Sequence, residues 1–238
     1  MQHLDELRSR LIVMLAAVAL GTAVAYVFHT HILDWLNQPL PADRQRLTTL
    51  GVAEPFSVSV TVSVYAGFLL ALPIILQQLW SFLAPAFDPR AERRVLAFVA
   101  FATVLGAAGL AFGYWVVLPR ALHWLTHYDA GNFHILIRAK DYYAFSSTIL
   151  LGIVALFELP LAVLGLVNLG VLTAERLRRN RRMGYFLVAL VALGLPGPDP
   201  VTTALELLPM WALFEGSIWL AVLAEKRGPR AAAAGVRA

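Results

Sequence analysis

The chain has 238 residues, of which 59% are hydrophobic and only 14% are charged, whereas a soluble domain is nearer half apolar and about a quarter charged. This composition excludes an ordinary soluble domain, and the long apolar runs indicate a membrane protein with several spans. The formal net charge of +4 is explained by basic residues in cytoplasmic loops, so we do not expect nucleic acid as a partner.

The first span is predicted at residues 11–28, an apolar run of 18 residues after a polar start. That start contains Asp5 and Glu6, whereas a cleaved signal peptide has a shorter apolar core and a plain basic start. We therefore expect this span to be retained. A loop at 29–55 follows, and the second span is predicted at 56–83.

A short loop at 84–94 separates the second and third spans. It contains two prolines, which stop helices, together with three arginines and two acids. A basic turn of this kind between two membrane-length runs is typical of the cytoplasmic side. Glu92 is unexpected in such a loop, because an acid contributes nothing to orientation. We interpret Glu92 as half of a docking site for a cationic partner.

The third span is predicted at 95–118, where Pro119 is expected to end the helix. The fourth is predicted at 142–172, with an interruption at Glu158 and a kink at Pro160. A loop with five arginines follows the fourth span.

The last two spans are expected to be short. The fifth apolar run, at 183–195, has 13 residues and reaches roughly 20 Å, against a hydrocarbon core of about 30 Å. The sixth, at 201–224, is interrupted by Glu206 and Glu215. Short spans either thin the bilayer locally or are accommodated by flanking side chains, and both interpretations stay open.

Topology follows from the basic residues. Of the 19 lysines and arginines, 14 lie in the start of the chain, the 84–94 loop, the 173–182 loop and the C-terminal segment. This asymmetry predicts that both termini are cytoplasmic. We expect one six-helix transmembrane domain at 1–226 and a disordered cytoplasmic tail at 227–238.

Glu158 lies near the middle of the fourth apolar run. A charge at the bilayer centre costs about 3 kcal/mol on insertion scales, so this side chain must face protein or water, or carry a proton. One interpretation is a structural hydrogen bond between helices, with Gln77 or Gln78 as its partner. The other is the polar lining of a groove that admits a polar segment of a substrate or partner.

Glu6 and Glu92 both lie at the inner membrane surface by this topology. Two acids at the mouth of an inward-facing groove suit an arginine ligand that binds in a bidentate manner. The alternative is that each acid is a solvated partner of a nearby arginine of the chain, such as Arg8, Arg10 or Arg94.

Other polar residues give weaker signals. Asp199, in the turn before the sixth span, is expected to cap that helix with Pro200 at its first position. His123 and His127 have a spacing that could bind a metal, but no third ligand is apparent. The sequence contains no zinc-protease helix motif, phosphate loop or nucleophile elbow. We therefore predict neither an enzyme nor a cofactor.

A rival function is a proton-coupled small-solute transporter with Glu158 as the proton relay. Such folds often contain internal repeats with matching broken helices near the midplane. No convincing repeat is found in this chain.

A set of short motifs follows in order along the chain: His3-Leu4-Asp5-Glu6-Leu7-Arg8-Ser9-Arg10, Pro39-Leu40, Glu54-Pro55-Phe56, Gln78-Leu79-Trp80-Ser81-Phe82-Leu83-Ala84-Pro85, Glu92-Arg93-Arg94, Gly109-Leu110-Ala111-Phe112-Gly113-Tyr114, Phe157-Glu158-Leu159-Pro160, Pro198-Asp199, Pro209-Met210 and Phe214-Glu215. The ordered set resembles the TatC family, the large membrane subunit of the twin-arginine protein translocase. The resemblance extends over nearly the whole chain, from about residue 3 to residue 224.

The resemblance implies an all-α polytopic membrane protein with six transmembrane helices in a concave, glove-like bundle. It implies that acids on the cytoplasmic face recognise the paired arginines of a signal peptide. Glu6 and Glu92 would bind those arginines, with Arg8 and Phe82 around them.

The resemblance also assigns the remaining positions and the partners. Gln78 and Glu158 would line the concave face, and Pro39 and Asp199 would be outer positions that matter for assembly or transport. The implied partners are the lipid bilayer, single-span subunits of the same translocase, twin-arginine signal peptides of folded precursors, and further copies of this chain. The resemblance implies a receptor in the plasma membrane, driven by the proton-motive force. Glu206 matches no position of the family pattern, and its role stays open.

Overall fold

Helices account for nearly all of the chain that the structure describes. The computed structural model describes residues 2–41, 45–83, 91–128, 131–132, 136–168, 171–194 and 200–227. The helices are α1 (Gln2–Val27), α2 (His29–Asn37), α3 (Glu54–Leu83), α4 (Ala91–Phe112), the π-helical segment η3 (Gly113–Val117), α5 (Leu118–His127), α6 (Ala139–Phe157), α7 (Leu159–Asn168), α8 (Ala174–Arg179), α9 (Arg181–Leu193) and α10 (Pro200–Arg227). Within these ranges the one strand-like pairing is an isolated bridge between Thr48 and Arg138.

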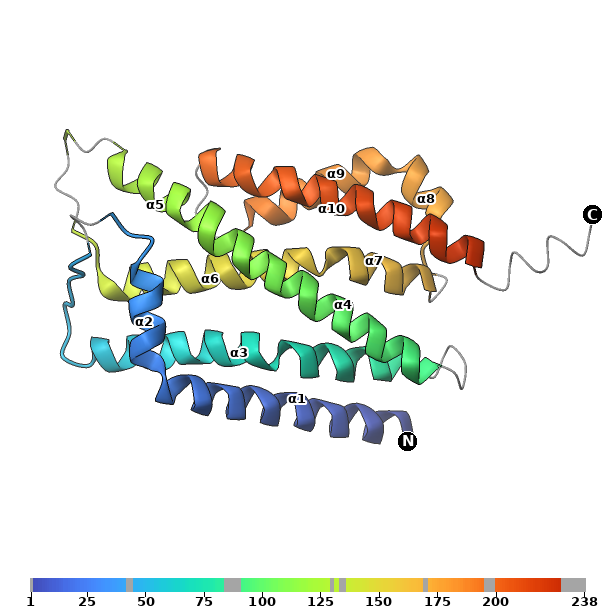
Figure 1. Ribbon diagram of the computed structural model, residues 1–238, viewed down its shortest axis with the longest axis horizontal. Helices are drawn as coiled ribbons and strands as arrows, with labels where there is room; N and C mark the ends of the chain where they lie inside the picture. Colours follow the sequence, from blue (N-terminus) through green and yellow to red (C-terminus); the bar gives the residue numbers. More distant parts are fainter. Residues whose placement is uncertain are drawn as a thin grey trace, which may run out of the picture.

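The long helices run beside one another between two ends of a bundle (Figure 1). At one end, called here the N-terminal end, α1 and α4 begin, α3 and α10 end, and α8 lies nearby. At the opposite end, called the far end, α2 lies near the end of α5 and the start of α6. Sites that are distant in the sequence are therefore brought to the same end of the bundle.

Five helical segments are long and apolar enough to cross a membrane within the described residues, as expected for a multi-pass membrane protein. Their outer surfaces carry large apolar side chains in the open, including Leu20, Leu70, Trp115 and Leu208. Water would penalise such a surface, whereas lipid tails are themselves apolar. The α9 helix, with 13 residues, is as short as predicted, and a total of six spans stays a prediction.

The α1 and α3 helices approach each other closely through two glycines. A Cβ atom added to Gly67 would overlap the backbone of Thr22, and one added to Gly21 would lie 2.6 Å from the carbonyl oxygen of Gly67. Small residues allow the two backbones to come into contact. Between membrane helices this close van der Waals packing drives association, because lipid is as apolar as the side chains and the hydrophobic effect contributes little. This crossing fixes α1, whose apolar window is otherwise only 6% buried, against the bundle.

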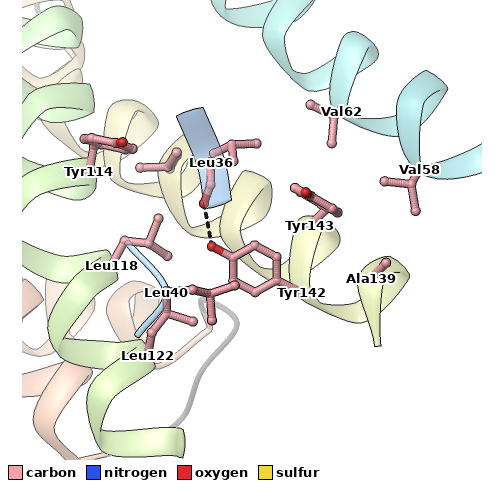
Figure 2. Close-up of a cluster of buried hydrophobic side chains, with 11 residues drawn as sticks. Leu36, Leu40, Val58, Val62, Tyr114, Leu118, Leu122, Ala139, Tyr142 and Tyr143 are labelled. Carbon is pink, nitrogen blue, oxygen red and sulfur yellow. Dashed lines mark hydrogen bonds between the residues drawn. The ribbon is translucent and has the colours of Figure 1, made fainter. Parts of the chain in front are cut away.

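The far end is organised around α2, a helix within the segment 29–55 that is predicted as a loop. Leu36 and Leu40 are buried in a cluster with Leu118, Leu122 and Tyr142 (Figure 2). The Tyr142 hydroxyl donates a hydrogen bond to the carbonyl oxygen of Leu36. The cluster therefore joins α2 to both α5 and α6.

A second tyrosine holds the same helix. The Tyr114 hydroxyl donates to the carbonyl oxygen of Trp35 over 2.8 Å. The two rings stack with a centroid separation of 3.7 Å. Carbonyl groups in the last turn of a helix often lack intrahelical partners. Tyr142 supplies a donor to the Leu36 carbonyl, and Tyr114 adds a second donor to the Trp35 carbonyl, which also accepts from the Gln38 N–H.

Pro119 does not end the third span, contrary to prediction. The helix passes through η3 and continues as α5 to His127. Proline occupies one of the first two positions of α5, and its missing N–H is needed least there. The wider π turn before it accommodates the change in hydrogen bonding.

The predicted interruption at Glu158 is confirmed, because α6 ends at Phe157 and α7 begins at Leu159. The expectation of a short sixth helix is wrong: α10 has 28 residues and continues through Pro209. Glu206 does not break this helix. The residue is 1% exposed and lies inside the bundle. The predicted tail beyond residue 227 lies outside the described residues.

Candidate functional site

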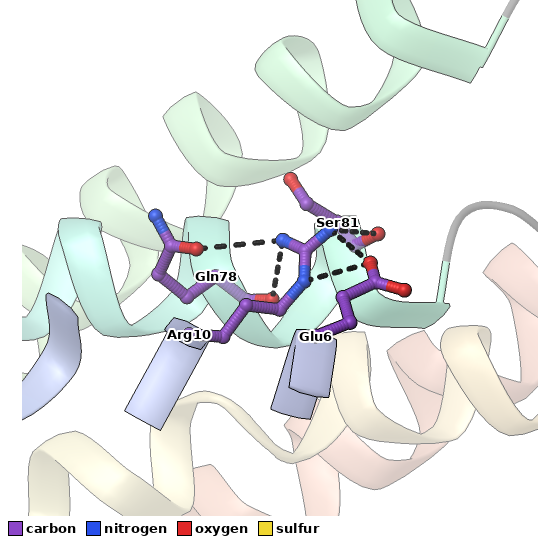
Figure 3. Close-up of polar contacts among 4 residues, drawn as sticks. All are labelled: Glu6, Arg10, Gln78 and Ser81. Atoms are coloured by element: carbon purple, nitrogen blue, oxygen red, sulfur yellow. Dashed lines mark hydrogen bonds and ion pairs between the residues drawn. The ribbon is translucent and has the colours of Figure 1, made fainter. Parts of the chain in front are cut away.

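Arg10 is the centre of a polar cluster at the N-terminal end, where it joins α1 to α3 (Figure 3). Its Nη2 and Nε atoms donate to the same carboxylate oxygen of Glu6, over 2.7 and 3.1 Å. Nη2 also donates to the carbonyl oxygen of Ser81 over 3.2 Å. Nη1 donates over 3.4 Å to both the carbonyl and the side-chain oxygen of Gln78.

The local sequence explains why this arginine occupies that position. Residues four apart lie on the same face of a helix, so Arg10 stacks over Glu6 on α1. Ser81 belongs to the last turn of α3, where carbonyl oxygens have no partner within the helix. A cation at a helix C-terminus also interacts favourably with the helix dipole. Arg10 therefore caps α3 while it orients Glu6.

Glu6 keeps one side open. Both contacts with Arg10 use Oε1, while Oε2 points away from the guanidinium (Figure 3) and receives no hydrogen bond from the described residues. The side chain of Glu6 is 38% exposed, against 21% for Arg10. The carboxylate is therefore fixed on one side and accessible on the other, which is the arrangement that a second cationic ligand requires.

The other predicted binding residues lie at the same end where the structure describes them. Arg8 is exposed on α1, and Phe82 is partly buried in the last turn of α3. The backbone of Glu92 lies in the first turn of α4, which begins at this end of the bundle (Figure 1). The side chain of Glu92 lies outside the described set.

Glu158 lies at the break between α6 and α7. Both of its carboxylate oxygens are shielded from solvent and have no hydrogen-bond partner among the described residues. Oε1 faces Gly106 of α4, where an added Cβ would lie 3.1 Å from it and 3.2 Å from Leu72. The predicted partner Gln78 instead contacts Arg10. The structure therefore does not join the two polar residues predicted for the concave face.

Of the residues predicted to matter at the far end, the structure describes some and not others. Pro39 is partly buried in the turn after α2, next to buried Leu40. Asp199 lies outside the described residues. The His123 and His127 rings stack at 4.2 Å, and His127 Nδ1 contacts the His123 carbonyl over 2.8 Å. No cluster of three potential metal ligands occurs within the described ranges.

Comparison with known proteins decides the family. Residues 2–209 match the family described as Sec-independent protein translocase protein (TatC). The chain belongs to the TatC family. A member of this family is a component of the Sec-independent translocase, so it works together with other Tat subunits.

Two TatC proteins illustrate the match, each over more than 90% of its own length. The chain is 35% identical to TatCd of Bacillus subtilis (strain 168), over 96% of this chain and 93% of the relative. It is 31% identical to TatC of Carboxydothermus hydrogenoformans, over 92% and 91%. The crystal structure of the twin-arginine translocase receptor TatC in DDM superposes with a TM-score of 0.81 and 29% identity, over 92% of this chain and 99% of that one. The resemblance and the all-α membrane fold predicted from sequence are thus confirmed.

Two polar centres of this TatC chain were not predicted from sequence as sites. The sequence indicates Arg10 only as one possible partner of an acid, although its spacing from Glu6 is a visible signal. The second is Glu54, whose buried carboxylate contacts Arg138 Nε over 2.9 Å. Glu54 also accepts hydrogen bonds from the backbone N–H groups of Leu50, Gly51 and Lys140.

The Glu54 carboxylate therefore joins the segment after α2 to the segment before α6 at the far end. The backbone supports the same connection, since Thr48 donates to Ile137 and accepts from Ala139, both over 2.9 Å. The pKa of Arg138 is raised by its hydrogen bond to the Glu54 carboxylate. The motif Glu54-Pro55-Phe56 identifies the acid in the sequence, but its partner Arg138 lies 84 residues away.

Proposed function

We propose that this chain is the receptor subunit of the twin-arginine translocase and binds twin-arginine signal peptides of folded precursors at the N-terminal end of the bundle. The observation that carries this proposal is the Glu6 carboxylate, which Arg10 holds from one side and leaves accessible on the other. Membership of the TatC family supports it. The receptor lies in the plasma membrane with both termini in the cytoplasm, and the proton-motive force drives transport.

Glu6 and Glu92 each take one guanidinium of the signal peptide in this proposal. An arginine presents a planar fork of N–H donors that matches a carboxylate in two parallel hydrogen bonds, whereas a lysine is a point charge. A site built from carboxylates therefore selects arginine over lysine by geometry as well as by charge. Phe82 supplies apolar contact beside the acids, and Arg8 disfavours binding of ligands with further positive charge nearby.

Glu158 and Gln78 contribute to the face that receives other subunits. A carboxyl group shielded from solvent without a hydrogen-bond partner is costly, and a polar side chain from a single-span subunit would reduce that cost. Gly106 lets α4 lie close to Oε1, since even an added Cβ would be only 3.1 Å from it. Pro39 and Asp199 act at the far end in assembly with further copies of this chain or with other subunits.

The direct test is a pull-down of the purified protein with three immobilised peptides: a signal peptide with paired arginines, the same peptide with paired lysines, and one with paired glutamines. We expect retention by the arginine peptide and at least tenfold less by the lysine peptide, because the bidentate hydrogen bonds are lost. Equal retention by arginine and lysine peptides would argue for nonspecific attraction and against a receptor.

A further inference from the structure

The surface formed by α8 and the start of α9 concentrates positive charge at the N-terminal end. Five arginines lie within seven residues: Arg176, Arg178, Arg179, Arg181 and Arg182. Four are exposed, and only Arg181 makes an ion pair among those described, with Glu215 at 3.5 Å. Glu175 is the one acid within α8 itself. The patch therefore presents several guanidinium groups without internal neutralisation.

Packing explains why these arginines point outward. Ala174 and Leu177 contact a buried cluster that includes Val167 and Ala221, so one face of α8 is fixed against α10. The remaining side chains of this short helix are exposed. Thr173 caps its start by accepting from the Arg176 N–H over 3.2 Å. The local structure thus holds the basic face away from the protein.

The apolar surface of α9 begins directly beside this basic face. Val188 and Ala192 are buried against α10, whereas Met183, Phe186 and Leu190 are 59%, 61% and 55% exposed. These exposed residues follow Arg182 on the outward face of the helix. A molecule bound here meets guanidinium groups at one end and a strip of apolar side chains along its length.

The structure assigns this surface as a binding site for an anionic phospholipid. The phosphate headgroup is bound by Arg178, Arg179 and Arg182, and the acyl chains lie along Met183, Phe186 and Leu190. An acidic polypeptide would match the charge but not the adjoining apolar strip. Because α9 has only 13 residues, its basic end and its apolar face both fall within reach of one lipid molecule.

The chain contains no cysteine, so Leu187→Cys, at an exposed position of α9 outside the proposed contact residues, gives a single labelling position near the patch. The labelled protein is reconstituted in phosphatidylcholine vesicles that contain a small fraction of spin-labelled phosphatidylglycerol or spin-labelled phosphatidylcholine. We expect the anionic probe to quench the fluorophore with about fivefold higher apparent affinity than the zwitterionic probe, given the attraction of a single basic residue to an anionic surface.

Charge-matched variants separate the site from general attraction. In the labelled background, the triple substitution Arg178→Gln, Arg179→Gln and Arg182→Gln should abolish the preference. A control variant removes three exposed cations near the far end, by Arg46→Gln, Arg120→Gln and Lys140→Gln. This control should keep the preference for the anionic probe. Lysine in place of the three patch arginines should retain most of it, because the positive charges remain. Circular dichroism checks that the glutamine variant keeps the helix content of the unsubstituted protein. Equal quenching by the two probes in the unsubstituted protein, or an unchanged preference in the glutamine variant, would overturn the proposal.

Discussion

Arg10 and Glu6 form an ion pair of 2.7 Å across one turn of α1, and the same guanidinium reaches the last turn of α3. The pair is therefore both a local helix contact and part of a connection between α1 and α3, in which Arg10 contacts Gln78, 68 residues away in sequence. This arrangement separates two roles, since Arg10 positions the acid and Glu6 offers its free oxygen to a ligand.

Replacing Arg10 should weaken the attachment of α1 to α3. Arg10→Gln removes the charge-assisted hydrogen bonds to Glu6 and Ser81, and we expect a loss of about 1 kcal/mol in the free energy of unfolding, after allowance for partial exposure. Denaturant titration in detergent measures this change in the free energy of unfolding. Arg8→Gln is the control, because Arg8 is exposed on the same helix. Equal stability of the two variants would show that the cluster does not hold α1.

The glycine contact between α1 and α3 predicts opposite outcomes for the same chemical change at two positions. Alanine is the better helix former by about 1 kcal/mol. At Gly216, where an added Cβ meets nothing within 4 Å, Gly216→Ala should be neutral or stabilising. Gly67→Ala should destabilise by about 2 kcal/mol, because the new methyl group overlaps the backbone of Thr22 and forces the helices apart. Thermal unfolding in detergent compares them, and a stabilised Gly67→Ala variant would contradict the close crossing.

The Glu54–Arg138 pair should be essential for the far end. Glu54 is buried and accepts hydrogen bonds from two segments, so Glu54→Gln should lower the free energy of unfolding clearly more than a change at an exposed acid. A double-mutant cycle with Arg138→Gln measures the coupling between the two residues. Glu175→Gln, which changes an exposed acid, serves as the control. Additive effects of the two single changes would show that the pair is not a structural connection.

Glu158 is predicted to act in transport and assembly instead of stability. Glu158→Leu removes a shielded carboxyl group that has no hydrogen-bond partner among the described residues, so insertion and helix content should be unchanged. Export of a twin-arginine precursor should fall at least about tenfold, the effect of one lost charge-assisted contact. Circular dichroism checks the helix content, and an export assay checks the transport of the precursor. Normal export would reduce Glu158 to a packing role.

Local patterns were sufficient to predict the apolar spans, the break at Glu158 and the short α9. They were insufficient where distant contacts decide the outcome. A proline in an apolar run predicts the end of a helix, but at residue 119 the π turn before it allows the helix to continue. The pattern of residues 29–37 does not predict the α2 helix, because the segment is short, lies among loop residues and is held by distant contacts with Tyr114 and Tyr142.

The candidate site shows the same division. Motifs identified Glu6 and its neighbours as residues of interest, and the i, i+4 spacing makes the contact with Arg10 visible in retrospect. The contacts of Arg10 with Gln78 and Ser81 depend on the crossing of α1 and α3, which the sequence alone does not specify. The same is true of the partner of Glu54, since the segments that contain Thr48 and Arg138 meet only in the folded bundle.

Affinity for a twin-arginine signal peptide tests the receptor proposal most directly. A labelled peptide is titrated against the unsubstituted protein, the Glu6→Gln/Glu92→Gln variant and a Glu175→Gln control. We predict that the double variant binds at least about a hundredfold more weakly, because each carboxylate contributes roughly tenfold through charge-assisted hydrogen bonds, while the control binds normally. Unchanged affinity of the double variant would contradict the proposal that these two acids bind the arginine pair.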